Sequence, residues 1–304
     1  MSYKSAKLRV DFFGAAHRDR LGHFEIEPVP GKSTPGRFME RSGGAALNAA
    51  RIFHALGGLG RLFSVVGDDA HGQGISGELE QLGIGGHLQK HTDCPTASYT
   101  ALIKPDGSVL YGLADMHVYE RFQASNFALG ADQPDFAFID ANLPETAIAE
   151  LIDRVSSKIC LATISPAKAA RLRKCLGNCA LLVTNSEEAA ALLGSSSASS
   201  AVLAKGLIEQ CVETCVISDG GNPVCYADRN GHGSVAVDRT ASLVDATGAG
   251  DSLCAAVMFG LANGWPLEKA VRFGVAVAQQ IIQIEGPWNE ALLNSLPELL
   301  NAHE

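Results

Sequence analysis

The chain lacks an apolar run of the length needed to cross a membrane. No stretch of about 18 consecutive apolar residues occurs, so we expect no membrane-spanning helix. The first apolar segment, residues 8–13, is short and interrupted by Asp11, which is unlike the core of a signal peptide. Together these absences favour a cytoplasmic protein.

Positive charge is also scarce, because Lys and Arg number 24 against 33 Asp and Glu, for a net charge of −9. Proteins that bind nucleic acid or anionic membranes usually carry a basic surface. We therefore expect neither as the main partner, although a few local groups can still hold a nucleotide.

The eight cysteines show no zinc-site spacing. Reduced, buried thiols are the simplest interpretation.

Two common nucleotide-binding motifs are missing. Residues 31–33 (Gly-Lys-Ser) match the end of a P-loop, but Ile26 occupies the earlier glycine position. Pro28 and Pro30 also stand where the loop needs free amides. Residues 13–16, after the first apolar run, contain one glycine and not the three of a dinucleotide-binding motif. Any nucleotide must be held in another way.

What is present is an alternation of short apolar runs with helical patterns, in a chain that is 46% hydrophobic and 19% charged. The runs predict strands at Leu8–Phe13, Arg61–Val66, Phe136–Ile139, Ile159–Thr163, Leu181–Val183 and Cys215–Ser218. Helical patterns lie at Ala45–Leu56, Gly74–Leu82, Pro144–Val155, Ala167–Leu176, Ser186–Leu193, Ala201–Glu209, Asp251–Asn263 and Leu267–Gln283. This order predicts an α/β fold with a doubly wound, mostly parallel sheet, whose ligands bind at the carboxyl ends of the strands.

One segment interrupts this alternation. Residues 97–104 and 108–113 alternate apolar and polar side chains around a Pro-Asp-Gly turn, which predicts a β-hairpin outside the main sheet. The Gly- and Pro-rich residues 19–37 could pair with it. We expect one domain, residues 1–304, with a small lid formed by about residues 19–37 and 97–114.

The segment Asp245-Ala-Thr-Gly-Ala-Gly-Asp251 precedes a small-residue apolar run that predicts a helix. Unpaired N–H groups at a helix start can hold a phosphate, and the helix dipole reinforces them. Asp251 would then stand where the phosphate meets a nucleophile and act as its base. The alternative is an ordinary helix start, where Gly and Asp are common.

Further candidate ligands follow the other predicted strands. Gly43 and Gly44 precede a helix that carries Asn48, whose side chain suits a sugar hydroxyl. Alternatively, the paired glycines let the start of this helix pack tightly on the sheet. Asp19 could accept hydrogen bonds from a vicinal diol or could lie in a surface turn; the adjacent His17 and Arg18 are expected to be solvated. Asn185 and Glu188 fit a helix cap, and alternatively Glu188 could orient water on Mg²⁺.

Taken together, these segments resemble the ribokinase-like (PfkB) family of sugar and nucleoside kinases along nearly the whole chain. The motifs that carry the resemblance are Gly43-Gly44 with Asn48, Val66-Gly67-Asp68-Asp69 with Gly72, Asn185 with Glu188, and Asp245–Asp251, in the family's order. The resemblance implies a three-layer α/β/α domain with a β-sheet lid that is usually also used for dimerisation. It therefore predicts a homodimer formed through the lid.

The resemblance also implies a role for each site residue. Asp251 would be the base, a role for which an ordinary carboxylate pKa suffices because the hydroxyl proton leaves late, and the amides of Gly248, Ala249 and Gly250 would stabilise the transferring phosphoryl group. The remaining roles are substrate binding by Asp19, Gly43, Gly44, Asn48, Ser98 and Asn142; ATP binding by Asn185, Glu188, Ser218, Gly220 and Gly221; Mg²⁺ at Glu188 through water; and a monovalent cation, normally K⁺, at Asp245 and Thr247.

Short segments are similar to the branch of the family that phosphorylates pseudouridine. These are residues 96–99, 115–116, 140–142 and Ser165 with Lys168; Ala162 and Pro223 depart from the pattern. We therefore expect ATP-dependent phosphorylation of the 5′-hydroxyl of a ribosyl nucleoside, with pseudouridine as the acceptor. The alternatives are a ribokinase or other sugar kinase, or a catalytically silent relative that only binds a nucleoside or sugar.

Overall fold

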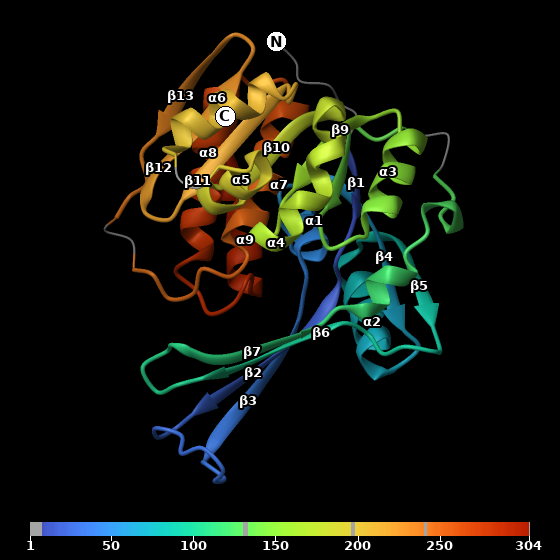
Figure 1. The fold of residues 1–304 in the computed structure, drawn as a ribbon, viewed down its shortest axis with the longest axis vertical. Helices are drawn as coiled ribbons and strands as arrows, with labels where there is room; N and C mark the ends of the chain where they lie inside the picture. Colours follow the sequence, from blue (N-terminus) through green and yellow to red (C-terminus); the bar gives the residue numbers. More distant parts are fainter. Residues whose placement is uncertain (1–7, 130–132, 196–197, 240–241, 304) are drawn as a thin grey trace.

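The computed structural model describes residues 8–129, 133–195, 198–239 and 242–303. Its centre is a nine-stranded sheet with the order β13-β12-β11-β10-β9-β8-β1-β4-β5 (Figure 1). The strands are β1 (Arg9–Phe13), β4 (Leu59–Gly67), β5 (Gly85–His91), β8 (Phe136–Asp140), β9 (Lys158–Ala162), β10 (Cys179–Asn185), β11 (Thr214–Asp219), β12 (Asn222–Asp228) and β13 (Gly231–Val235). Every pair is parallel except β11–β12 and β12–β13.

Helices cover both faces of this sheet, and together they form three layers. Neighbouring residues of β1 show the division, since Phe12 packs into one apolar cluster and Phe13 into the other. The first face carries α1 (Ala45–Ala55), α2 (Ala70–Leu82), α7 (Ala249–Ala262), α8 (Leu267–Ile281) and α9 (Glu290–Asn301); the second carries α3 (Glu145–Arg154), α4 (Pro166–Ala169), α5 (Ser186–Leu193) and α6 (Ser200–Glu209). The predicted fold class is confirmed.

A second sheet of four strands, ordered β3-β2-β6-β7, projects from the three-layer body (Figure 1). It consists of β2 (His17–Phe24), β3 (Gly36–Gly43), β6 (Ser98–Ile103) and β7 (Val109–Asp115). The predicted hairpin is therefore present, and the N-terminal segment pairs with it through β2, which runs parallel to β6. Only residues 14–16 separate β1 in the large sheet from β2 in the small one.

Some local expectations were wrong. The predicted helix at 167–176 is a single α-helical turn followed by a 3₁₀ segment, Ala170–Asn178. Helix α9 was missed because Pro297 lies inside it.

The thiols of Cys160 and Cys254 are buried as expected, but Cys211 is exposed. Within the described ranges, no helix combines the length and the apolar character that crossing a bilayer requires.

Candidate active site

The start of α7 has the geometry of an anion site. Gly248 caps the helix in the left-handed conformation, with φ of 79°. A Cβ there would lie 2.5 Å from Cβ of Pro287, so both the backbone and the packing require glycine. The amide of Ala249 already donates to the carbonyl of Ala246 at 3.2 Å. Gly250 has open space beside its Cα and lines two adjoining pockets.

Asp251 lies in the first turn of α7, where Oδ2 accepts a hydrogen bond of 2.9 Å from Nδ2 of Asn48. Burial raises the pKa of Asp251 to about 7, and the charges of Asp140 and Glu188 act in the same direction, against the Asn48 hydrogen bond and the charge of His17. The pKa of Asp251 therefore lies above the ordinary value that would have sufficed for a base. The side chains that surround Asp251 come from distant parts of the chain, and the local sequence does not show them.

Asp140, at the end of β8, is a site residue that we did not predict. It is fully buried, and its carboxylate accepts hydrogen bonds from the amides of Ala15 at 2.7 Å, Ala46 at 3.2 Å and Asn142 at 2.8 Å. One carboxylate thereby fixes the end of β1, the start of α1 and the loop after β8. Burial raises the pKa of Asp140.

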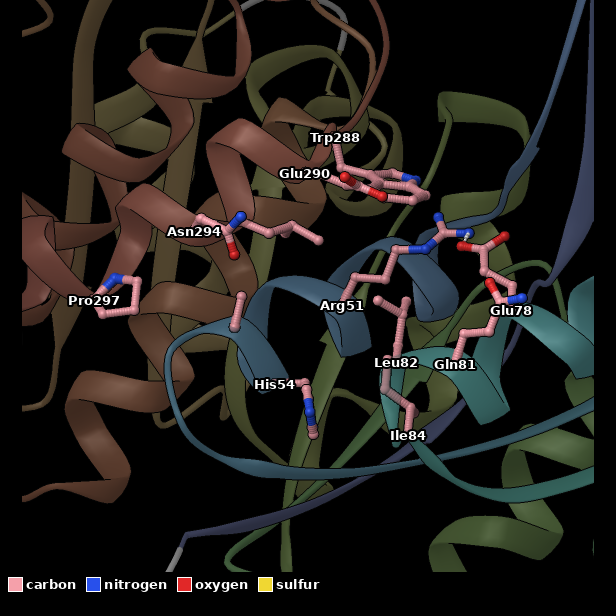
Figure 2. A pocket seen from close by; sticks show the side chains of 12 residues that line it. Arg51, His54, Glu78, Gln81, Leu82, Ile84, Trp288, Glu290, Asn294 and Pro297 are labelled. Atoms are coloured by element: carbon pink, nitrogen blue, oxygen red, sulfur yellow. Dashed lines mark ion pairs between the residues drawn. The ribbon is translucent and has the colours of Figure 1, made fainter.

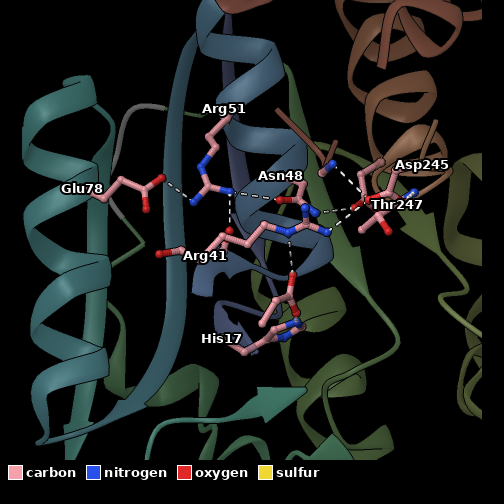
Figure 3. Close-up of polar contacts among 11 residues, drawn as sticks. His17, Arg41, Asn48, Arg51, Glu78, Asp245 and Thr247 are labelled. Atoms are coloured by element: carbon pink, nitrogen blue, oxygen red, sulfur yellow. Dashed lines mark hydrogen bonds and ion pairs between the residues drawn. The ribbon is translucent and has the colours of Figure 1, made fainter. Parts of the chain in front are cut away.

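Asp19 lies on β2 and is buried, with only 6% of its surface exposed. A Cβ on Gly43 would lie 2.3 Å from Oδ2 of Asp19, so this glycine makes room for the carboxylate. Oδ1 is 3.1 Å from Nε2 of His17, and Oδ2 is 3.7 Å from Nε of Arg41 (Figure 3). His17 was expected to be solvated, but it is largely buried and contacts Asp19. No local sequence pattern indicated Arg41, which β2–β3 pairing places opposite Asp19.

Of the other predicted substrate residues, Gly44, Asn48 and Asn142 lie in or beside the three-layer body, whereas Ser98 lies on the small sheet. Gly44 precedes α1 close to Ala15, and Asn48 is buried within that helix. Asn142 is buried, and its Oδ1 accepts a hydrogen bond of 2.6 Å from Nζ of Lys168. Ser98 pairs with Arg18, whereas Tyr99 pairs with Asp19. Because side chains alternate along a strand, Ser98 lies on the opposite face of the small sheet from Asp19.

Three of the five residues predicted to bind ATP line a pocket of about 370 Å³ beside α7. Ser218, Gly220 and Gly221 form one side of it, where β11 turns into β12. Its other walls are mainly apolar and come from β12, α7, α8 and the segments between β13 and α7: Val224, Val237, Asp238, Arg239, Leu243, Ala246, Ala249, Gly250, Leu253, Val275, Ala278, Gln279 and Ile282. A planar ring with a polar edge fits such a lining.

A neighbouring pocket of about 230 Å³ contains both Glu188 and Asp251. The side chain of Asn185 accepts a hydrogen bond of 2.8 Å from the amide of Glu188, and Oε2 of Glu188 accepts one of 3.2 Å from the amide of Asn185. The capping interpretation is therefore confirmed. Thr163 also donates to Oε2 of Glu188. The lining has two carboxylates and no basic side chain, a donor set that suits a hard cation such as Mg²⁺.

The Asp245 carboxylate, which was expected to bind a monovalent cation, already accepts from N–H donors. Oδ1 of Asp245 accepts from the amide of Thr247 at 2.8 Å, and Oδ2 accepts from the amide of Gly286 at 3.0 Å. Nη2 of Arg41 is 3.4 Å from the same Oδ2 (Figure 3). These N–H donors fit a cation at the Asp245 carboxylate poorly. A cation ligand role for Asp245 and Thr247 stays a prediction.

The three-layer fold and the grouping of Asp251 with a helix start and a nucleotide-sized pocket define the class: a sugar or nucleoside kinase with a ribokinase-like fold. The comparison with known families agrees. The chain belongs to the pfkB family of carbohydrate kinases, whose model matches residues 8–291.

Individual relatives cover most of the chain. It is 26% identical over 286 residues to the pseudouridine kinase of Escherichia coli, covering 91% of each protein. Among solved structures, a carbohydrate kinase from Agrobacterium tumefaciens is 29% identical, with a TM-score of 0.81 and coverage of 96% of this chain and 97% of that one. A ribokinase from Thermotoga maritima, 20% identical, has a TM-score of 0.83 over 97% of this chain and 99% of its own.

Proposed function

We propose that this kinase transfers the γ-phosphoryl group of ATP to the 5′-hydroxyl of a ribosyl nucleoside, with pseudouridine as its acceptor. The observation that carries the proposal is the position of Asp251. Asp251 lies in the first turn of α7, lines the smaller pocket with Ser218 and Gly250, and accepts a hydrogen bond from the buried Asn48. A general base belongs at such a junction, because it must reach the acceptor hydroxyl next to the phosphoryl group.

In the proposed reaction, Asp251 accepts the proton of the acceptor hydroxyl as oxygen attacks phosphorus. Charge that develops on the phosphoryl oxygens is stabilised by the N-terminal dipole of α7 and by the amides of Gly248 and Gly250. The amide of Ala249 contributes less than we first expected, because it already bonds Ala246. Binding of donor and acceptor removes water from this region, which strengthens these interactions.

The donor is proposed to occupy the two adjoining pockets. Its adenine would lie among the apolar side chains that include Val275 and Leu253, and its phosphates would extend past Gly250. Glu188 and Asn185 would hold Mg²⁺ through water at the smaller pocket. When bound, the metal supplies charge neutralisation between the donor phosphates and the two carboxylates.

The acceptor is proposed to lie between the two sheets. Asp19 would accept hydrogen bonds from two ribosyl hydroxyls, and Gly43, Gly44 and Asn48 would form the floor below the sugar. Asn142, whose amide is held by Lys168, is well suited to reading the edge of a base. The likeness to a pseudouridine kinase along 91% of the chain supports this acceptor.

The lid carries a second proposal, a homodimer formed through its outer face. Phe38, Tyr111 and Leu113 are more than half exposed, and strand pairing places them on the face opposite Asp19. Exposed apolar side chains gathered on one sheet face are typical of a protein interface. A second copy of this chain would cover them.

A panel of acceptors tests the proposed reaction. We expect ATP consumption with pseudouridine to exceed that with uridine, ribose or fructose. Asp251→Asn should lower turnover at least about a hundredfold, because the amide cannot accept the proton. Preferential turnover of ribose or fructose would instead support a sugar kinase. Equal turnover by the variant would refute the base assignment, and the absence of turnover with every acceptor would favour the catalytically silent alternative.

A further inference from the structure

Arg51 is a fully buried cation that none of the roles above uses. It lies on α1, only 1% of its surface is exposed, and its guanidinium pairs with Glu78 of α2. Trp288 covers the guanidinium, with Cζ 4.8 Å from the ring centroid. Figure 2 shows Trp288 on one side of Arg51 and Glu78 on the other. Burying a charge is costly, so such an arrangement needs a compensating reason.

The guanidinium also reaches toward the proposed base. Nη1 of Arg51 donates to Oδ1 of Asn48 at 3.0 Å and to the carbonyl of Ser42 at 3.2 Å (Figure 3). The other end of the same amide, Nδ2 of Asn48, donates to Asp251 at 2.9 Å. Glu78, Arg51, Asn48 and Asp251 therefore form one continuous polar chain from α2 to α7.

Arg51 determines which way the amide of Asn48 faces. An asparagine side chain has an acceptor end and a donor end. With Oδ1 against Arg51, Nδ2 must face the carboxylate of Asp251. The flipped amide would place its N–H groups against a guanidinium and its oxygen against a carboxylate, and both contacts are repulsive.

We propose that Arg51 is a positioning residue, which is held by Glu78 and Trp288 and fixes the Asn48 amide so that it donates to Asp251. The inference rests on the proposed phosphoryl transfer, with Asp251 as base. Arg51 acts only through Asn48 in this role and touches neither donor nor acceptor. Its removal would leave the amide free to rotate and Asp251 without a fixed donor.

The charged groups around these hydrogen-bonded side chains determine in which direction the pH profile of activity should shift when Arg51 is removed. Asp140 and Glu188 face Asp251 and disfavour its ionised form, whereas His17 favours it. Glu78 and Asp19 are the charged groups that face Arg51. Because the Asn48 donor favours ionised Asp251, loosening it shifts the acid side of the activity profile to higher pH.

A cavity makes the proposal accessible to chemical rescue. A cavity of about 480 Å³ lies away from the proposed reaction centre and is lined by Arg51, Glu78 and Trp288, together with residues of α1, α2 and α9 (Figure 2). Truncating Arg51 to Ala would join this cavity to the space beside Asn48. A free guanidinium ion fits the vacated position, since Glu78 and the Trp288 ring still flank it.

The experiment compares wild type, Arg51→Ala, Asn48→Ala and the double variant, with ATP and the acceptor that wild type turns over. We expect Arg51→Ala to lower kcat/KM at least about tenfold and to move its acid limb up by about one pH unit. Guanidinium at non-denaturing concentration should reverse both changes, whereas methylammonium should not. In the Asn48→Ala background, Arg51→Ala should have little further effect.

Additive losses in the double variant, or an unchanged pH profile in Arg51→Ala, would overturn the proposal. Circular dichroism identifies variants that fail to fold. If Arg51→Ala does not fold, Trp288→Leu takes its place, because it frees one face of the guanidinium and keeps the Glu78 pair. Trp288→Leu must then shift the acid limb of kcat/KM to higher pH, and no shift would refute the positioning role of Arg51. If wild type and Asp251→Asn are equally inactive, the proposed function itself has failed; if only the Arg51 effects are missing, this inference alone has failed.

Discussion

Replacing Asp251 with Asn should stabilise the ligand-free protein, and the gain should depend on pH. The fold raises the pKa of this carboxyl from its ordinary 3.8 to about 7. Ionised Asp251 is therefore less favourable in the folded chain than in the unfolded one. An amide of the same shape removes that cost, so the variant loses activity and gains stability.

The magnitude follows from the difference in pKa. A shift of about three pKa units corresponds to at most about 4 kcal/mol, which is reached above pH 7. Below pH 3.8 the carboxyl is protonated in both states and the cost disappears. The stability difference between variant and wild type should therefore grow by about 2 kcal/mol between about pH 5.5 and about pH 8.

Urea denaturation of both proteins without ligands, followed by fluorescence of the two tryptophans at several pH values, measures this difference. Other titrating groups are common to both proteins and largely cancel. The matched activity measurement is kcat/KM of wild type, which should fall about tenfold between about pH 8 and about pH 6. A stability difference that stays constant across the range would refute the argument that burial raises this pKa.

Three further outcomes test other parts of the site. Because Arg41 already faces Asp245, we expect K⁺ to raise wild-type turnover at most about twofold. In Arg41→Gln, turnover and thermal stability should respond more strongly to K⁺ than to Na⁺. If wild type and variant respond equally to K⁺, the prediction is contradicted. Gly43→Ala should displace Asp19 and raise the KM for acceptor at least about tenfold with the KM for ATP unchanged, whereas parallel changes would argue against a substrate role. Leu113→Asp should convert a homodimer to monomer in sedimentation analysis, and a persisting dimer would exclude this face.

Much of the fold was predictable from the sequence because its signals are local. Apolar runs and helical patterns predicted the doubly wound sheet, and a Pro-Asp-Gly turn predicted the hairpin of β6 and β7. The segment 245–251 predicted both a helix start and an anion site. Helix 167–176 was misjudged because its apolar spacing fits both α-helix and 3₁₀ turns.

The contacts that hold the candidate site residues in place were much less predictable from the sequence. Asp140 contacts Ala15 across 125 positions, and no local pattern indicates that pairing. Arg51 is an exception, because it lies three residues after Asn48 on the same helix, a spacing that brings side chains together. Arg41 could have been found by pairing Asp19 with the opposite strand, had the register of the small sheet been known. Sequence spacing predicted the candidate reacting groups, whereas the pKa of Asp251 depends on side chains from distant parts of the chain.

The hydrogen bonds of Asp140 have a mechanical consequence for the small sheet. The chain enters that sheet through residues 14–16 and leaves β3 for α1 at residues 43–45, and Asp140 binds the amides of Ala15 and Ala46 beside these two crossings. The sheet is thus anchored at its inner end and extends from the body like a lever (Figure 1). Any movement of the small sheet against the body would therefore displace its outer turns most and Asp19, near the anchored end, least.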